Sequence, residues 1–193
     1  MSASRPGAAV FLDRDGTLIR DVGHLSRPEQ LEILPGVPAA LRSLRDCGFK
    51  LIVVTNQSVV ARGRLSESDL AGIHDLLREK LAAQGAFLDA IYYCPHHPSE
   101  GQGDYRIVCN CRKPRTGMVD QAAADLGLNR RASYVVGDQA RDIELAAQVG
   151  ATGILLHDGP VVAAAGAPPV VADLWQATQW IIAQEGRLSE REA

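Results

Sequence analysis

Short apolar runs alternate with amphipathic segments along most of this chain, and this alternation constrains its fold more than any other feature. Apolar runs bounded by turn residues predict buried strands at 8–12, 50–55, 89–93, 133–136 and 153–156, with an edge strand at 170–171. Amphipathic spacing predicts helices at 38–47, 66–84, 117–126, 140–149 and 173–184. Parallel strands need long, usually helical crossovers. The expected fold class is therefore α/β, a Rossmann-like parallel sheet with helices on both faces.

Length and composition fit one globular domain, predicted over residues 1–193. With 46% hydrophobic and 22% charged residues, the chain can bury a core without disulfides. A net charge of -3 disfavours a nucleic-acid partner. The first ten residues show no secretory leader, and the apolar stretch 160–172 is interrupted by prolines and shorter than the roughly 20 residues of a membrane helix. We expect a cytoplasmic monomer with neither a membrane nor a nucleic-acid partner.

Polar side chains gather where the predicted strands end. They are Asp13, Asp15 and Gly16 after the first strand, Thr55, Asn56, Gln57 and Ser58 at the second, and Gly137, Asp138 and Asp142 at the fourth, with Arg112 and Lys113 before a helix. Ligands of parallel sheets bind at the carboxyl ends of the strands, so these groups are expected to share one crevice. Converging carboxylates repel one another unless a cation neutralises them, and a few hard oxygen ligands suit Mg²⁺. Together with a hydroxyl, an amide and a lysine, they suit phosphoryl transfer.

Each of these residues also has an ordinary structural explanation. Asp-x-Asp-Gly is a common turn, Asp138 could cap the following helix, and Lys113 could be a solvated surface residue. Turn chemistry does not explain why all of them fall at strand ends in this order.

These motifs resemble those of the haloacid dehalogenase (HAD) superfamily of phosphatases. The resemblance rests on Asp13-Arg14-Asp15-Gly16-Thr17, Thr55-Asn56, Lys113-Pro114 and Gly137-Asp138 with Asp142. It implies that Asp13 attacks phosphorus and forms an aspartyl-phosphate. It also implies that Asp15 is the general acid and base, and that Thr55 and Lys113 hold the phosphoryl group.

The same resemblance implies the metal ligands and the shape of the domain. Asp13, the backbone carbonyl of Asp15, and Asp138 would bind Mg²⁺, while Asp142 would orient the lysine. The length leaves no room for a separate cap domain, so a capless HAD core is expected. Specificity must then come from short loops.

Three of the four cysteines lie in the long irregular segment 94–111. With His96 they offer four ligands for a closed tetrahedral Zn²⁺ site: Cys94, His96, Cys109 and Cys111. Disulfide pairing is the alternative, although it would leave one cysteine over. Cys47 is interpreted as a small core residue, and His24, His74 and His157 are expected at solvated or core positions. A structural zinc would fix the loop that leads directly into Arg112 and Lys113.

Within the HAD superfamily, two phosphatase groups share the zinc-loop pattern. Cys-Pro-His-His-Pro followed by Cys-x-Cys-Arg-Lys-Pro resembles the D-glycero-D-manno-heptose 1,7-bisphosphate 7-phosphatases and, more distantly, the histidinol-phosphate phosphatases. The resemblance to the heptose group implies an Mg²⁺-dependent hydrolase that acts in the biosynthesis of ADP- or GDP-heptose and of the lipopolysaccharide core. It implies sugar-bisphosphate contacts from Asp21, Gly23, Thr55, Asn56, Gln57, Ser58, Arg112 and Lys113.

The chain departs from the heptose group at three places. Val59-Val60 replaces Gly-Ile, His24 stands where tyrosine is common, and Gln139 follows the motif aspartate where lysine is usual. The last two bear on anomer preference and on the second phosphate. Three alternative functions remain: a histidinol-phosphate phosphatase of histidine biosynthesis, a zinc-stabilised binding module without catalysis, and a phosphatase of nucleic-acid ends.

Overall fold

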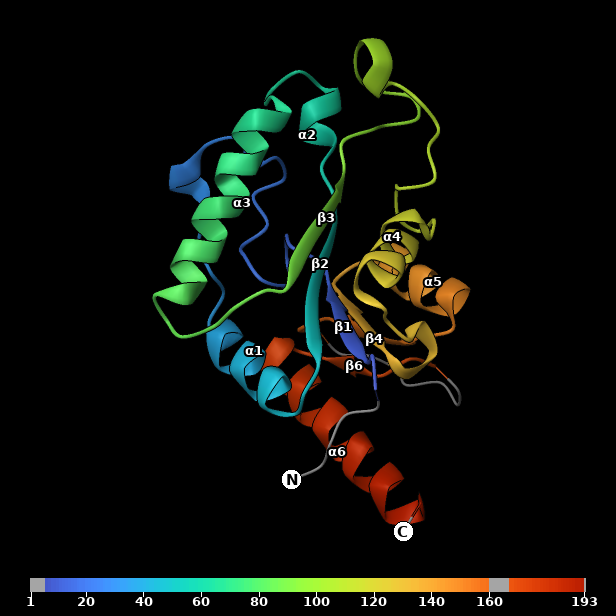
Figure 1. The fold of residues 1–193 in the computed structure, drawn as a ribbon. Coiled ribbons are helices and arrows are strands. Elements are labelled where there is room, and N and C mark those ends of the chain that lie inside the picture. The colour runs from blue at the N-terminus through green and yellow to red at the C-terminus, as the bar shows by residue number, and fades with distance from the viewer. Residues whose placement is uncertain (1–5, 160–166, 193) are drawn as a thin grey trace.

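Six parallel strands form the centre of the molecule in this computed structural model, which describes residues 6–159 and 167–192, with side chains to 188 (Figure 1). The strands are β1 (Ala9–Leu12), β2 (Lys50–Asn56), β3 (Ala90–Cys94), β4 (Tyr134–Gly137), β5 (Thr152–Leu156) and β6 (Val170–Val171). Their order is β3-β2-β1-β4-β5-β6, and every neighbouring pair is parallel. The chain therefore starts at the centre of the sheet and winds first to one edge and then to the other.

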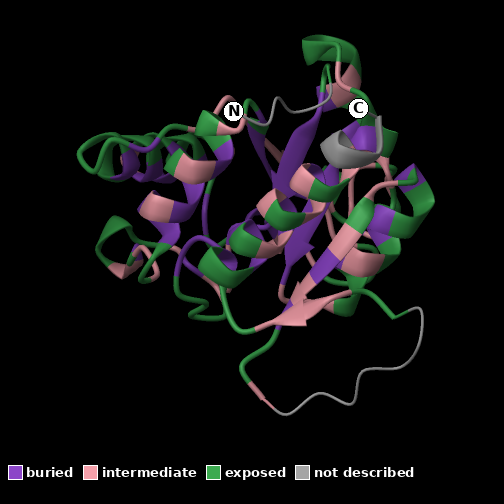
Figure 2. Cartoon of the chain, turned by 90° about the horizontal axis from the view of Figure 1, so that it is seen from below, coloured by how far each residue is buried: buried purple, intermediate pink, exposed green. Residues whose placement is uncertain are grey.

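Helices cover both faces of this sheet. The helices α1 (Val37–Asp46), α3 (Glu67–Ala82) and α6 (Leu174–Glu192) pack with one core cluster, and α4 (Gly117–Leu126) and α5 (Ala140–Val149) pack with a second. Alternate residues of β1 point into opposite clusters, since Val10 and Leu12 join the first and Ala9 and Phe11 the second. Figure 2 shows the buried strands between helices that are exposed on their outer sides. The predicted fold class is confirmed.

Most predicted elements are confirmed to within two residues, and the differences have local causes. The four-residue helix α2 (Ser58–Ala61) was not predicted, because it is too short to show a periodic apolar stripe. The last helix ends at Glu192 and not near Gln184. Tyr134 donates a hydrogen bond to Glu185 (2.6 Å), which holds this helix against β4 beyond the predicted end.

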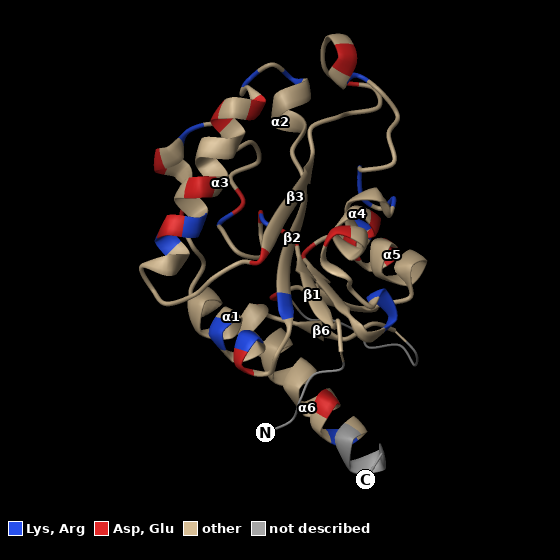
Figure 3. Cartoon of the chain, viewed as in Figure 1, with Lys and Arg blue, Asp and Glu red and all other residues tan. Residues whose placement is uncertain are grey.

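The strand ends bring the predicted polar motifs to one edge of the sheet. Because β1, β2 and β4 are adjacent and parallel, their carboxyl ends point the same way. Charged residues lie mainly on the helices and loops and hardly at all within the strands (Figure 3). Within the described residues, no helix has the length and apolarity to cross a membrane. Of the apolar stretch 160–172, residues 160–166 lie outside the described residues.

Candidate active site and metal centre

A cavity of about 180 Å³ opens at the carboxyl ends of β1, β2 and β4. Its walls are mainly polar and come from five segments of the chain: Asp13, Arg14, Asp15, Asp21, Gly23, His24, Leu25, Thr55, Asn56, Gln57, Ser58, Val59, Arg112, Asp138, Gln139 and Arg141. All the predicted sugar-bisphosphate contacts are among them except Lys113. The structure therefore brings together motifs that lie more than a hundred residues apart in the sequence.

Lys113 lies behind the cavity wall. Its ammonium group pairs with Asp13 at 2.8 Å and with Asp142 at 2.7 Å, and its side chain is only 1% exposed. Burial acts to lower the pKa of Lys113, but the two carboxylates outweigh it and the pKa is raised. The side-chain amide of Asn56 accepts from the Lys113 backbone N–H (2.9 Å) and donates to its carbonyl (3.2 Å). The end of β2 thus fixes the lysine next to Asp13.

Asp138 completes a cluster of carboxylates with Asp13 and Asp142, each offering an oxygen within 4.8 Å of the others. One Asp138 oxygen accepts from Gln139 (2.7 Å), whereas its Oδ1 is buried and has no hydrogen-bond partner among the described residues. Burial raises the pKa of Asp138, and the negative charge of Asp13 raises it further. Both oxygens of Asp142 already have partners, Lys113 for Oδ1 and the Gln139 N–H for Oδ2 (3.1 Å), whereas Asp13 pairs with Lys113 through Oδ1. Asp13 and the unpartnered Asp138 oxygen are therefore the donors suited to a hard cation such as Mg²⁺.

The backbone after Asp15 runs directly against this carboxylate. A β-carbon added at Gly16, whose φ is +78°, would lie 2.5 Å from Asp138 Oδ2. Only glycine fits this close approach. The chain next to the Asp15 carbonyl, a predicted Mg²⁺ ligand, therefore lies beside the cluster of carboxylates that could hold a metal ion.

The Asp15 side chain is held by two neighbours. The guanidinium of Arg14 donates to both of its oxygens at 3.1 Å, and the Gln57 amide donates to Oδ2 at 2.8 Å. The same amide nitrogen donates to Thr55 Oγ1 at 2.8 Å. Arg14 is 1% exposed and also contacts His74 on α3. Sequence reasoning assigned no role to Arg14 and expected His74 only at a solvated or core position, because no local spacing connects them.

Cations lie at the rim of the cavity. Arg112 donates to the His96 carbonyl (3.0 Å), and its burial lowers its pKa, although arginine stays charged in proteins. Arg141, in the first turn of α5, also lines the cavity and was missed because it falls between two motif residues. On the opposite loop, Asp21 accepts from the Gly23 N–H at 2.7 Å. Two of the residues at which the sequence departs from the heptose group, His24 and Gln139, line this cavity.

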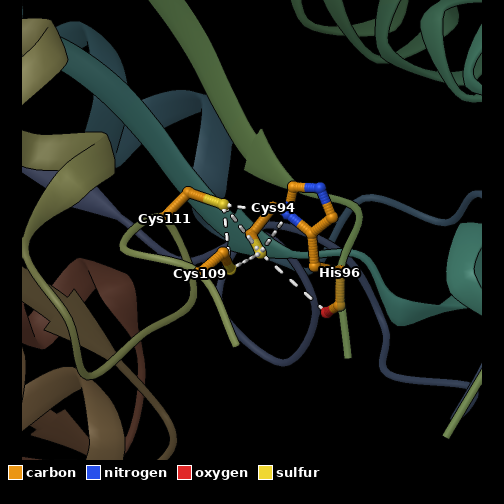
Figure 4. A group of neighbouring side chains, drawn as sticks. All are labelled: Cys94, His96, Cys109 and Cys111. Carbon is orange, nitrogen blue, oxygen red and sulfur yellow. Dashed lines mark hydrogen bonds between the residues drawn. The ribbon is translucent and has the colours of Figure 1, made fainter. Parts of the chain in front are cut away.

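A second cluster contains the predicted zinc ligands (Figure 4). The Sγ atom of Cys111 lies 3.1 Å from that of Cys94 and 3.2 Å from that of Cys109, and the Nδ1 atom of His96 lies 3.3 Å from Cys111 Sγ. All four cysteines are free, and Cys47 lies apart against the main core cluster. Three thiols and one imidazole nitrogen converging in this way fit a closed Cys₃His zinc site rather than a disulfide.

The loop that carries this cluster docks on the start of α2. The Gln57 N–H donates to the Cys94 carbonyl (2.7 Å) and the Ala61 N–H to the Pro95 carbonyl (3.2 Å), while Ala61 accepts from the Gln102 N–H (2.9 Å). The cluster thus fixes both the cavity wall at Gln57 and the chain that enters Arg112.

Comparison with known proteins gives consistent results at three levels. Residues 110–177 match the HAD-hydrolase-like family model. A D-glycero-beta-D-manno-heptose-1,7-bisphosphate 7-phosphatase from Haemophilus ducreyi is 44% identical over 82% of this chain and 87% of its own length. The protein of the same name from Escherichia coli (strain K12) is 39% identical over 90% of this chain and 87% of its own. The chain belongs to this HAD phosphatase family.

A solved structure supports the assignment of this chain to the HAD phosphatase family. The D,D-heptose 1,7-bisphosphate phosphatase from B. bronchiseptica, complexed with magnesium and phosphate, has a TM-score of 0.78 and 30% identity, over 92% of this chain and 99% of its own. The resemblance of the sequence motifs to HAD phosphatases is confirmed.

Proposed function

We propose that this protein is an Mg²⁺-dependent phosphatase that removes the 7-phosphate of D-glycero-β-D-manno-heptose 1,7-bisphosphate. The relatives that carry this name cover most of the chain at 38–44% identity. The observation that carries the chemistry is the Asp13 carboxylate on the cavity wall, paired with the buried Lys113 and next to the partly unpartnered Asp138.

In the proposed reaction, a carboxylate oxygen of Asp13 attacks phosphorus. The bond between phosphorus and the sugar oxygen breaks, and Asp15 gives its proton to that leaving oxygen. The resulting aspartyl-phosphate is hydrolysed when a water attacks phosphorus and gives a proton back to Asp15. Asp13 is released, inorganic phosphate leaves, and Asp15 ends protonated as it began. Lys113, paired with Asp13 at 2.8 Å, would hold this carboxylate pointed at the substrate.

The cofactors are Mg²⁺ and Zn²⁺, with different tasks. Asp13, the Asp15 carbonyl and Asp138 would hold Mg²⁺, which when bound supplies positive charge to the phosphoryl oxygens. Cys94, His96, Cys109 and Cys111 would hold a structural Zn²⁺.

The second phosphate of the substrate would meet the cations at the rim. Arg112 can contact phosphate oxygens bidentately, and Arg141 adds positive charge on the α5 side of the same cavity. Gln139 donates to Asp138 and supplies no charge where the heptose group often has lysine. We therefore assign the distal phosphate to the two arginines.

Parallel measurement of phosphate release tests the substrate. We expect the largest kcat/KM with the β-anomer of the heptose bisphosphate, a smaller one with the α-anomer, and the smallest with histidinol phosphate. A larger value with histidinol phosphate would assign the chain to histidine biosynthesis instead. An Asp13→Asn variant should lose activity on every substrate, and undiminished hydrolysis by it would exclude the aspartyl-phosphate route.

A further inference from the structure

Arg14 is a buried cation whose hydrogen bonds lead away from the cavity as well as into it. It lies between the two motif aspartates at the end of β1, with 1% of its surface exposed. An arginine in such a place needs an acceptor on each side of its guanidinium, because water cannot supply one. On the cavity side the acceptors are Asp15, through Nε and Nη2, and Gln57, which accepts from Nη2 at 2.7 Å.

The acceptor on the far side is His74. Its Nε2 lies 3.2 Å from Arg14 Nη1, and its ring is 4% exposed. Arginine can only donate, so His74 Nε2 must be unprotonated and the ring proton must sit on Nδ1. Burial lowers the pKa of His74 to about 3, and the positive charges of Arg14 and Arg78 act in the same direction. The ring therefore stays neutral, as an acceptor, throughout the physiological range.

The imidazole is itself held in place. Its ring lies 5.6 Å from that of Tyr93 on β3, and the Tyr93 hydroxyl donates to Glu67 at the start of α3 (2.6 Å). His74 points from the middle of α3 and is not part of the cavity wall. The contacts thus form a continuous line from α3 through Arg14 to the carboxylate of Asp15.

We propose that His74 is a positioning residue for the phosphatase reaction: by accepting from Arg14 it fixes the guanidinium fork that orients Asp15 toward the leaving oxygen. This inference rests on the proposed function, in which Asp15 is the general acid. Without the acceptor, a buried guanidinium N–H is unsatisfied, and the fork must turn to find a new partner. Rotation of the fork moves both Asp15 oxygens, because each accepts from it.

A mispositioned acid slows departure of a poor leaving group far more than that of a good one. The sugar alkoxide needs a proton as its bond to phosphorus breaks, whereas 4-nitrophenolate leaves without one. The ratio of kcat/KM for the heptose bisphosphate to kcat/KM for 4-nitrophenyl phosphate therefore reports on the position of Asp15. General loss of folded enzyme lowers both values equally and leaves the ratio unchanged.

The test compares three variants with the wild-type zinc- and Mg²⁺-loaded enzyme. His74→Leu removes the acceptor from α3, and His74→Gln keeps an acceptor oxygen at a similar reach. Leu77→Ala is the control, because Leu77 is buried on the same helix and its aliphatic side chain cannot accept a hydrogen bond from Arg14. We expect His74→Leu to lower the ratio by about tenfold or more, within the range that general acid catalysis supplies. His74→Gln should restore most of it, and Leu77→Ala should leave it unchanged.

Equal losses on both substrates in His74→Leu, or no loss, would overturn the positioning role. If this variant does not fold, ¹⁵N NMR of the wild-type imidazole decides. We expect a neutral ring at pH 5 with its proton on Nδ1, and a cationic ring or a proton on Nε2 would refute the inference. Failure of the wild-type enzyme to hydrolyse the heptose bisphosphate would instead refute the proposed function, while the NMR result would still stand.

Discussion

Replacing Lys113 by methionine tests the electrostatic arrangement at the bottom of the cavity. The substitution keeps an unbranched side chain only one atom shorter and removes the charge. Two carboxylates, Asp13 and Asp142, then lose a partner at 2.8 and 2.7 Å, in a place where the lysine is 1% exposed and Asp138 adds a third acidic group. Solvent cannot screen charges that lie this deep.

The expected cost follows from burial. Removing one partner of a buried ion pair typically costs about 3–5 kcal/mol, because an uncompensated charge stays behind. For a chain of this size that corresponds to a fall in Tm of roughly 6–20 °C. We expect this loss in urea or thermal unfolding at pH 7 in magnesium-free buffer, in zinc-containing protein.

A matched control uses the same substitution at an exposed pair. Lys50 contacts Asp89 at 2.9 Å, but its side chain is 53% exposed, so Lys50→Met should cost less than about 1 kcal/mol. Adding Asp142→Asn to Lys113→Met removes one uncompensated carboxylate and should restore roughly half of the loss. Equal destabilisation by the two lysine substitutions, or no recovery in the double variant, would refute the view that these charges act as one buried group.

Three further predictions concern metals and a helix cap. Because the pKa of Asp138 is raised in the folded protein, its ionised form costs stability; metal-free protein should gain stability as the pH falls through this raised pKa toward the ordinary value of 3.8. Mg²⁺ binds the ionised form, so stabilisation by Mg²⁺ (about 2.7 kcal/mol at a hundredfold excess over Kd) should shrink over the same pH interval, and equal Tm shifts at about pH 4 and about pH 7 would contradict this. Cys109→Ser should reduce zinc, measured by elemental analysis, below half an equivalent per chain; full retention would exclude Cys109 as a ligand. Ser66→Ala should cost about 1 kcal/mol in urea unfolding, because its hydroxyl caps α3 by accepting from the Asp69 N–H (3.0 Å), and should leave kcat/KM unchanged.

The sheet and the strand-end motifs were predictable from sequence because each depends on local patterns. Apolar runs of four to seven residues identify the strands, and parallel pairing brings their carboxyl ends together whatever the loops do. Asp13, Thr55 and Asp138 follow directly from that rule. Lys113 was found as a motif residue, but its position behind Asp13 depends on the Asn56 clamp, which joins two distant segments.

The residues that sequence reasoning missed depend on tertiary contacts alone. Arg14 sits between two aspartates of a recognised motif, yet its partner lies sixty residues away on a helix whose pattern shows only a buried stripe. A histidine on such a stripe looks like any core residue. The role of His74 as an acceptor becomes visible only in the folded structure, where the buried guanidinium of Arg14 needs an acceptor and His74 of α3 lies next to it.

The contacts of the zinc loop bear on how the cavity distinguishes its substrates. The loop hydrogen-bonds to Gln57 in the cavity wall and to Ala61 at the end of α2, and it leads directly into Arg112 on another side of the cavity. We therefore expect zinc bound by these four residues to set the distance between Gln57, which contacts Asp15, and Arg112, the cation proposed for the distal phosphate. Loss of zinc should then weaken binding of a bisphosphate more than binding of an aryl monophosphate. The bisphosphate has to contact the walls at Gln57 and at Arg112 at the same time, whereas the monophosphate needs only one of them. An equal rise in KM for the two substrates would show that the loop stabilises the fold without setting this distance.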